Sequence, residues 1–211
     1  MASTPGRAGV PGRVFDVGMG EIVVLRHGQT EWSRDGKHTG LTDVPLLPEG
    51  EQQAREVSEA LAGRTFVEVR VSPRQRARRT AELAGLHATA VDDDLVEVDY
   101  GGYEGRTTAE ISAELGREWS VWQDGTVPGD SPGETLAAVG DRVDRVLERV
   151  RPRLGDGDVA LVAHGHVLRV LTARWLGLPP EAGALFALPA GSFGVLGHEH
   201  DRPVLTAWAL H

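Results

Sequence analysis

The chain has 211 residues, of which 40% are hydrophobic and 25% charged, a composition typical of a globular protein with a full apolar core. It contains no cysteine, which excludes disulfide frameworks, iron–sulfur clusters, thiolate zinc sites and cysteine nucleophiles. Its net charge of −9 argues against nucleic-acid and anionic-membrane partners, because both need a basic surface.

The first 20 residues, MASTPGRAGVPGRVFDVGMG, are rich in glycine and proline and lack the apolar core of a signal peptide. We therefore expect a flexible tail over 1–20. Because a domain has about 100–200 residues, we expect a single domain over 21–211. No later apolar run approaches the roughly 18 residues of a transmembrane helix. These features predict a cytoplasmic protein.

Short apolar runs alternate with helical periodicities along the domain. Strands are expected at Glu21–Leu25, Phe66–Val71, Asp158–Ala163, Phe193–Leu196 and Val204–Trp208. Strands that alternate with helices are typical of α/β proteins. The sequence therefore predicts a three-layer α/β sandwich with a mainly parallel central sheet.

Helices are expected between these strands. One follows Pro48, and a second runs from an N-cap at Ser72 towards Leu83. Two capping boxes, Thr107-x-x-Glu110 and Ser131-x-x-Glu134, each predict a further helix start, the second opening a long helix with apolar residues at helical spacing. A last helix is expected over Val167–Leu176.

Residues with anion-binding and titratable side chains come directly after three of the strands. Arg26 and His27 follow the first strand, Arg76 lies one turn beyond the second, and His164 follows the third. Ligands of such sheets bind outside the carboxyl ends of the strands. We therefore expect these four side chains to meet at one edge of the sheet, as an anion site.

This set of side chains suits a phosphate monoester. Arginines bind its oxygens in a bidentate manner and lower the pKa of a histidine between them, which favours a neutral, nucleophilic ring nitrogen. A carboxylic acid must then protonate the leaving oxygen. Glu97, between two valines in a long acidic and glycine-rich loop, is the first candidate, because apolar surroundings raise the pKa of a carboxyl. Asp99 and Glu104 are the alternatives.

Two pairs of histidines allow a metal site to be considered. His164 and His166, and likewise His198 and His200, are two residues apart, and on a strand this spacing places both rings on one face. The first pair contains the predicted phosphate ligand His164, and the second lies next to a polar turn. We therefore expect neither a metal site nor a cofactor.

Five blocks in chain order resemble one known family. They are LRHGQTEWS, HTGLTDVPL, SPRQRARRTAEL, LVEVDYGGYEG and VAHGHVLRVL. Together they are similar to the histidine phosphatase superfamily, also called phosphoglycerate mutase-like, and most of all to its small-molecule acid phosphatases and its sedoheptulose-bisphosphatase type. The resemblance implies the histidine-phosphatase fold and a reaction through a phosphorylated histidine.

The resemblance also implies roles for individual residues. His27 matches the histidine that becomes phosphorylated, His164 the second pocket histidine and Glu97 the acid/base glutamate. The matches that imply phosphate or substrate binding are Arg26, Arg76, Gln29, Ser33, Thr39 and Gly40. Ser33 stands where the family often has asparagine, and its shorter side chain reaches less far towards phosphate.

The sequence therefore predicts a metal-independent phosphomonoesterase for small phosphorylated metabolites. A sugar phosphate or bisphosphate is the expected substrate, because the pocket is expected to be open and polar rather than aromatic. A phosphoglycerate-mutase-type phosphotransferase is the alternative, although the acidic and aromatic stretch Val98-Asp99-Tyr100 disfavours a carboxylated substrate. A non-catalytic phosphate-binding module is a third hypothesis, and a homodimer stays open.

Overall fold

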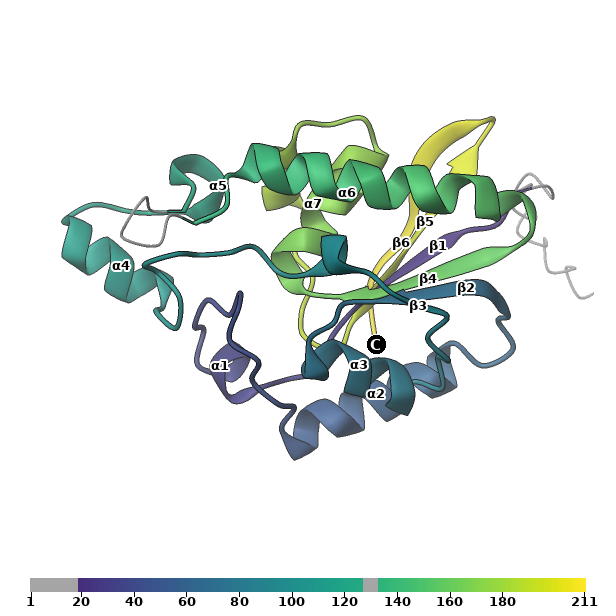
Figure 1. Cartoon of the computed structure of the whole chain (residues 1–211), viewed down its shortest axis with the longest axis horizontal. Coiled ribbons are helices and arrows are strands. Elements are labelled where there is room, and N and C mark those ends of the chain that lie inside the picture. The colour runs from purple at the N-terminus through teal and green to yellow at the C-terminus, as the bar shows by residue number, and fades with distance from the viewer. Residues whose placement is uncertain (1–18, 127–132) are drawn as a thin grey trace, which may run out of the picture.

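A six-stranded sheet forms the centre of the protein, and the computed structural model describes residues 19–126 and 133–211 (Figure 1). The strands are β1 Ile22–Arg26, β2 Phe66–Val71, β3 Ala90–Val91, β4 Asp158–Ala163, β5 Phe193–Glu199 and β6 Arg202–Leu210. Their order is β3-β2-β4-β1-β5-β6. The pairs among β3, β2, β4 and β1 are parallel, whereas β5 and β6 pair antiparallel. The predicted mainly parallel sheet is confirmed.

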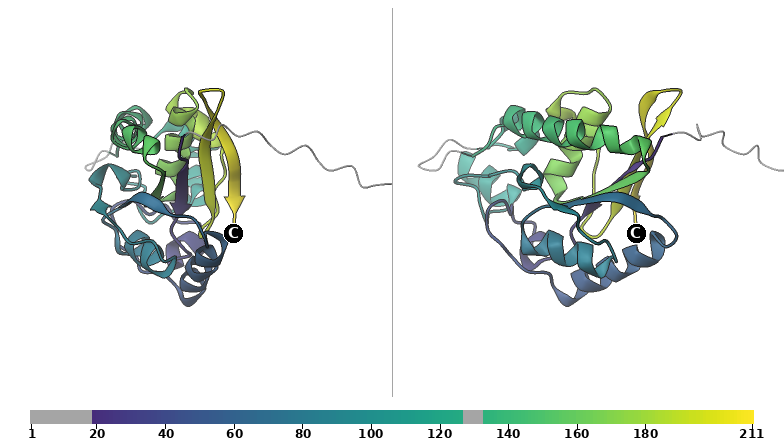
Figure 2. Two further views of the ribbon diagram at one scale, coloured as in Figure 1. Left: turned by 90° about the vertical axis from the view of Figure 1, so that its right-hand side faces the viewer. Right: turned by 45° about the vertical axis from the view of Figure 1, so that its right-hand side comes forward.

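Helices cover both faces of this sheet (Figures 1 and 2). On one face lie α2 (Pro48–Ala60) and α3 (Gln75–Leu83). On the other lie α6 (Leu136–Val150) and α7 (Gly165–Trp175). The predicted three-layer α/β sandwich is therefore confirmed.

The central strand β1 shows why its sequence is a continuous apolar run. Ile22 and Val24 belong to the apolar cluster that includes α6 and α7, whereas Val23 and Leu25 belong to the cluster that includes α2 and α3. Successive side chains of a strand point to opposite faces of the sheet. Because helices cover both faces, the first four positions of the strand are all buried and apolar, and Arg26 stands at its carboxyl end.

Shorter elements lie beyond the carboxyl ends of the parallel strands, at one end of the molecule (Figure 1). They are α1 (Glu31–Arg34), α4 (Thr108–Leu115) and α5 (Val121–Asp124). Three 3₁₀ turns, Asp93–Leu95, Arg151–Gly155 and Pro180–Leu185, connect other elements. None of the helices within 19–126 and 133–211 is both long and apolar enough to cross a membrane.

Two helix starts differ from the sequence prediction. The N-cap of α3 is Arg74 and not Ser72, whose hydroxyl accepts a hydrogen bond from the backbone of Arg74 at 3.4 Å and contacts a histidine from another strand end. The long helix α6 begins after Thr135, whose side chain accepts a hydrogen bond from the backbone of Ala138, whereas Ser131 lies outside the described residues. The capping box at Thr107 is confirmed.

The last predicted helix, α7, starts two residues earlier than expected, at Gly165. His166 therefore lies in the first turn of a helix, and His164 is its N-cap. Residues 1–18 of the predicted tail over 1–20 lie outside the described residues. Gly20, its last residue, donates a backbone hydrogen bond to the carbonyl of Leu154 at 2.7 Å.

Backbone hydrogen bonds hold three strand ends side by side. The backbone N–H of His27, just after β1, donates to Ala163 O at the end of β4, at 3.0 Å. The N–H of Ser72, just after β2, donates to Val162 O of β4, also at 3.0 Å. The fold thus brings together the segments that carry the predicted site.

Candidate active site

A pocket of about 150 Å³ lies at these strand ends. Its walls come from the β1 end, the segment after α1, the loop before α4 and the first turn of α7. The residues that line it are Arg26, His27, Ser33, Gly36, Lys37, His38, Thr39, Glu97, Tyr100 and His166. It therefore contains three of the five residues predicted to form the reaction centre.

His27 is buried and held in one tautomer. Its Nδ1 lies 2.7 Å from the carbonyl oxygen of Gly28, which can only accept, so Nδ1 carries the proton and Nε2 keeps a free lone pair. Burial, and after it the cations of Arg76 and Arg26, lowers the pKa of His27 well below its ordinary value of 6.5. The side chain is therefore a neutral imidazole with an unprotonated Nε2.

The backbone beside His27 is fixed by close packing. The N–H of Gly28 donates to the hydroxyl of Thr80 on α3 at 3.0 Å. A Cβ on Gly28 would lie 2.1 Å from the carbonyl oxygen of Gly50, so only glycine fits at this position. This contact holds the loop after β1 against α2.

Arg26 has a hydrogen-bond donor left over. Its Nη1 donates to the carbonyl of Leu188 at 2.6 Å, but its buried Nε has no partner among the described residues. A Cβ on Gly165 would lie 3.1 Å from the Arg26 Cζ, so glycine lets the guanidinium lie against the first turn of α7. Because Arg26 also lines the pocket, its guanidinium cation is suited to an oxyanion there.

Arg76 is fully buried and is not among the residues that line the described pocket. Its Nη1 and Nη2 donate to the carbonyl oxygens of Thr42, Thr39 and Gly40 at 2.9 to 3.3 Å. Its Nε donates to Nδ1 of His164 at 3.1 Å. Arg76 thus fixes the loop that borders the pocket and places a positive charge near His27.

His164 is also fully buried, and both its ring nitrogens are paired with protein groups. Nδ1 accepts from Arg76, so Nε2 carries the proton and donates to the Ser72 hydroxyl at 2.7 Å. The rings of His164 and His27 are 5.2 Å apart. Burial, followed by the charge of Arg76, lowers the pKa of His164 well below 6.5. In this arrangement His164 orients Arg76, and its contact with phosphate stays a prediction.

Glu97 lines the pocket beside the first turn of α7. Its Oε1 accepts hydrogen bonds from the backbone of Val98 at 3.0 Å and of Val167 at 2.9 Å. Its Oε2 accepts from the backbone of His166 at 3.0 Å. Two of these donors belong to the first turn of α7, whose dipole favours a negative group at this end. The carboxyl group is therefore held rigidly beside the pocket.

The two alternative acids do not line the pocket. Oδ1 of Asp99 accepts from the backbone of Gly101 at 2.9 Å. Both oxygens of Glu104 accept from the backbone of Gly40, at 3.0 and 2.9 Å, and one accepts from Thr42 at 3.0 Å. Glu104 thus holds the loop that binds Arg76. Among the three carboxylates, the geometry favours Glu97 as the acid.

The predicted substrate-bordering residues fall into two groups. Ser33 and Thr39 line the pocket, although the Ser33 hydroxyl also donates to Thr30 O at 3.1 Å. Gln29 and Gly40 are not among the lining residues of the described pocket. They carry the backbone contacts that shape it.

Sequence reasoning missed an aromatic wall. Tyr100, His38 and His166 line the pocket, with the rings of His38 and Tyr100 4.7 Å apart. The pocket that the sequence predicts to be open and polar rather than aromatic thus includes the ring of Tyr100 beside its polar groups. The second histidine of the His-Gly-His stretch is the available signal, but the sequence predicts it at a strand end, whereas it lies in the first turn of a helix. Lys37, the one lysine of the chain, lines the pocket too.

The two histidine pairs are not arranged as metal sites. His164 is an N-cap and His166 lies in a helix, so the strand geometry assumed for a shared metal does not apply. His198 packs against Trp175, with rings 4.9 Å apart, and His200 follows β5 in a turn with φ of 48°. Within 19–126 and 133–211, no group of three or more histidine, aspartate or glutamate side chains is placed to hold a metal ion.

Comparison with known proteins identifies the family. The family model of the histidine phosphatase superfamily (branch 1) matches residues 22–211. The chain therefore belongs to this superfamily, and the predicted histidine phosphatase enzyme is confirmed.

The relatives agree with the predicted type. An acid phosphatase of Mycobacterium tuberculosis is 41% identical over 196 residues, which are 90% of this chain and 92% of that protein. A sedoheptulose 1,7-bisphosphatase of Saccharomyces cerevisiae is 37% identical over 186 residues, 74% of this chain and 67% of that protein. A solved structure of an open reading frame product from Mycobacterium tuberculosis superposes with a TM-score of 0.85 at 38% identity, covering 90% and 97% of the two chains.

Proposed function

We propose that this protein is a metal-independent phosphomonoesterase that acts on small phosphorylated metabolites through a phosphohistidine on His27. The observation that carries the proposal is the neutral, single-tautomer imidazole of His27, whose free Nε2 shares a pocket with Glu97 and with the guanidinium of Arg26. Nucleophile, acid and oxyanion donor are thus in one small volume. The reaction needs no cofactor.

In the first step, Nε2 of His27 attacks phosphorus, and the bond from phosphorus to the ester oxygen breaks. Protonated Glu97 gives its proton to that oxygen, and the alcohol leaves. In the second step, Glu97 takes a proton from water, which attacks the phosphohistidine and releases inorganic phosphate. Arg26 and Arg76 stabilise the charge on the equatorial oxygens, and His164 keeps Arg76 oriented.

The substrate we favour is a sugar phosphate or bisphosphate in the cytoplasm. Two relatives support this class by their names, the yeast sedoheptulose 1,7-bisphosphatase and a mycobacterial glucosyl-3-phosphoglycerate phosphatase with a TM-score of 0.75 and 28% identity. The net charge of −9 supports small-molecule partners over nucleic acid or membranes. Phosphate release measured beside interconversion of 2- and 3-phosphoglycerate distinguishes a phosphatase from a mutase.

The acid role of Glu97 is tested with leaving groups of different basicity. A sugar alkoxide needs a proton in the transition state, an effect worth about 10²–10⁴ in rate, whereas nitrophenolate leaves without one. Glu97→Gln is therefore expected to slow phosphoryl transfer from a sugar phosphate far more than transfer from p-nitrophenyl phosphate. The phosphorylation step must be followed in a single turnover, because Glu97 also serves as base in the second step.

The control is Asp99→Asn, the same exchange of carboxylate for amide two residues further on and outside the pocket. Gln at position 97 turns one amide N–H towards a backbone N–H, so we expect a stability loss of about 1–3 kcal/mol. Thermal unfolding must therefore show that both variants are folded at the assay temperature. Equal slowing of the two substrates in the Glu97→Gln variant would refute the acid role.

A further inference from the structure

His166 has a side chain at the pocket that the proposed reaction does not use. Its backbone N–H holds Glu97, while its ring contacts Tyr100 and packs 5.0 Å from the ring of Trp122. The side chain is 20% exposed and forms part of the pocket wall. The question is which group the ring presents to a substrate.

Tyr100 determines the tautomer of this ring. The Tyr100 hydroxyl lies 2.6 Å from Nδ1 of His166 and has no other hydrogen-bond partner among the described residues. Because Tyr100 is only 1% exposed, its phenolic proton needs a protein acceptor, and Nδ1 is the one within reach. The phenol therefore donates and Nδ1 accepts.

Burial keeps both partners neutral. It raises the pKa of Tyr100 well above 10.0, with the charge of Glu97 as the second cause. It lowers the pKa of His166 well below 6.5, with Arg169 and His38 adding to the effect. A neutral imidazole whose Nδ1 accepts must carry its proton on Nε2.

The Nε2–H donor is accessible on a ring that forms part of the pocket wall. Nε2 has no acceptor in the parts of the chain that the structure describes, and it is not among their sealed, unpaired atoms. The ring lies beside the acid, with Nδ1 3.9 Å from Oε2 of Glu97. Since Glu97 protonates the ester oxygen, the Nε2–H of His166 is placed to donate a hydrogen bond to an oxygen near that ester oxygen, on the side of the leaving alcohol.

We propose that His166 Nε2–H donates a hydrogen bond to a hydroxyl on the carbon next to the phosphate ester, and that Tyr100 positions His166 by fixing its tautomer. This inference rests on the proposed phosphomonoesterase function. It makes His166 a specificity residue that selects polyol and sugar phosphates over plain alkyl phosphates. A site built to bind a hydroxyl disfavours an analogue without it, since its own polar group is then left unpaired.

The kinetic test compares glycerol 1-phosphate with propyl phosphate, which has the same three carbons and no hydroxyls. We expect the wild-type protein to prefer glycerol 1-phosphate in kcat/KM, and His166→Phe to reduce this preference about five- to tenfold, the effect of one hydrogen bond. His166→Gln, whose amide can still donate, should retain part of the preference. Equal slowing of both substrates by His166→Phe would overturn the proposal, because the donor would then serve the phosphoryl group.

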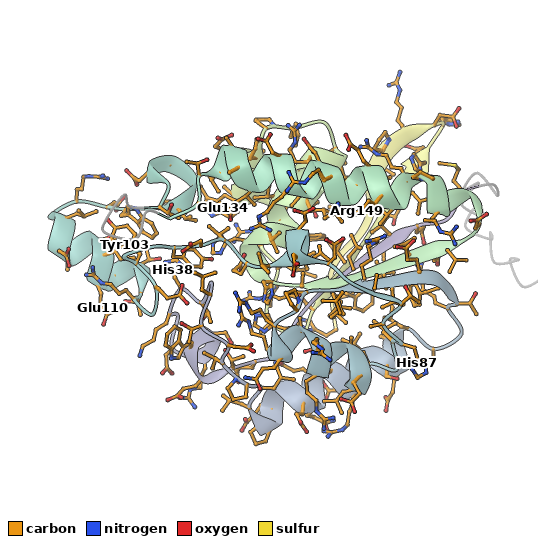
Figure 3. All side chains as sticks on the ribbon, viewed as in Figure 1. His38, His87, Tyr103, Glu110, Glu134 and Arg149 are labelled. Atoms are coloured by element: carbon orange, nitrogen blue, oxygen red, sulfur yellow. The ribbon has the colours of Figure 1, made fainter. Side chains whose placement is uncertain are left out.

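His87→Phe is the matched control. His87 is exposed and lies far from His38 and the pocket (Figure 3). The same exchange there should keep the wild-type preference for glycerol 1-phosphate. A loss of preference in this variant as large as that in His166→Phe would contradict the assignment to His166.

A binding measurement separates this inference from the proposed reaction. By calorimetry, the His27→Ala variant should bind glycerol 1-phosphate more tightly than propyl phosphate, whether or not the wild-type protein hydrolyses either. Absence of turnover would refute the phosphatase proposal, whereas equal binding of the two compounds would refute the role of His166.

The positioning role of Tyr100 has a spectroscopic test. Nitrogen NMR of the histidine-labelled protein should show Nε2 of His166 protonated and Nδ1 unprotonated. Tyr100→Phe should convert this into a mixture of tautomers and lower the preference for glycerol 1-phosphate. A protonated Nδ1 in the wild-type protein, or a tautomer that Tyr100→Phe leaves unaltered, would refute that role.

Discussion

The folded protein should lose stability as the pH falls from about 7.5 to 5.5, before its carboxylates titrate. Burial lowers the pKa values of His27, His164 and His166 well below 6.5 in the folded state. In the unfolded chain each imidazole binds a proton with a pKa near 6.5. The unfolded state therefore binds more protons below that pH. The contribution to stability is complete above about pH 6.5 and is lost as the pH falls towards the lower folded-state values.

The magnitude follows from the number of buried rings. One pH unit below the ordinary pKa, each of these histidines costs about 1 kcal/mol, and the three together about 3–4 kcal/mol. That is a large share of the roughly 5–15 kcal/mol that stabilises a typical domain. Urea unfolding at a series of pH values measures it, in buffers without phosphate, because a ligand of the folded state would mask the loss.

The pH slope of the unfolding free energy reports how many protons the chain takes up when it unfolds. We expect uptake that approaches three protons near pH 5.5, with a smaller share added by His38, whose pKa burial also lowers, and about one fewer in His166→Phe. A free energy of unfolding that stays flat over this range would refute the reasoning, since the imidazoles would then titrate alike in the folded and unfolded states.

Three further outcomes are expected. His27→Ala should abolish phosphate release while vanadate still binds at Arg26 and Arg76 in a calorimetric titration, and turnover above roughly a thousandth of the wild-type rate would contradict the nucleophile assignment. Gly165→Ala, whose Cβ would lie 3.1 Å from the Arg26 Cζ, should weaken vanadate binding roughly tenfold without lowering the thermal midpoint, because alanine suits a helix better than glycine. An unaltered affinity would show that Arg26 does not bind the anion. EDTA should leave turnover as it is, because side chains of the pocket supply nucleophile, charge and proton, and a loss that a divalent ion restores would point to a metal site instead.

The part of the site that depends on strand ends could be predicted from the sequence. Arg26 and His27 follow a run that is apolar on both faces, and His164 follows another. Such runs indicate buried parallel strands, and parallel strands present their carboxyl ends at one edge. The chemistry expected at that edge therefore followed from residue types and strand positions alone.

Contacts between distant segments could not be predicted in the same way. Ser72 precedes a proline, as a helix N-cap often does, yet its hydroxyl binds His164, 92 residues further on. Tyr100 and His166 meet across 66 residues. A local pattern contains no information on such a partner, so the aromatic wall and the second task of Arg76, which fixes a loop through three carbonyls, became visible only in the structure.

The hydrogen bonds that hold Glu97 come from a different part of the chain than the segment over 101–126. The Glu97 oxygens are held by backbone groups of His166 and Val167, at the start of a helix whose position the central sheet determines. The segment over 101–126, which carries α4 and α5, supplies none of these three hydrogen bonds. Substitutions at its exposed positions therefore leave the hydrogen bonds of Glu97 in place, whereas Ile111 and Trp119 belong to the apolar core. Libraries confined to these exposed positions are the natural route to new substrate preferences.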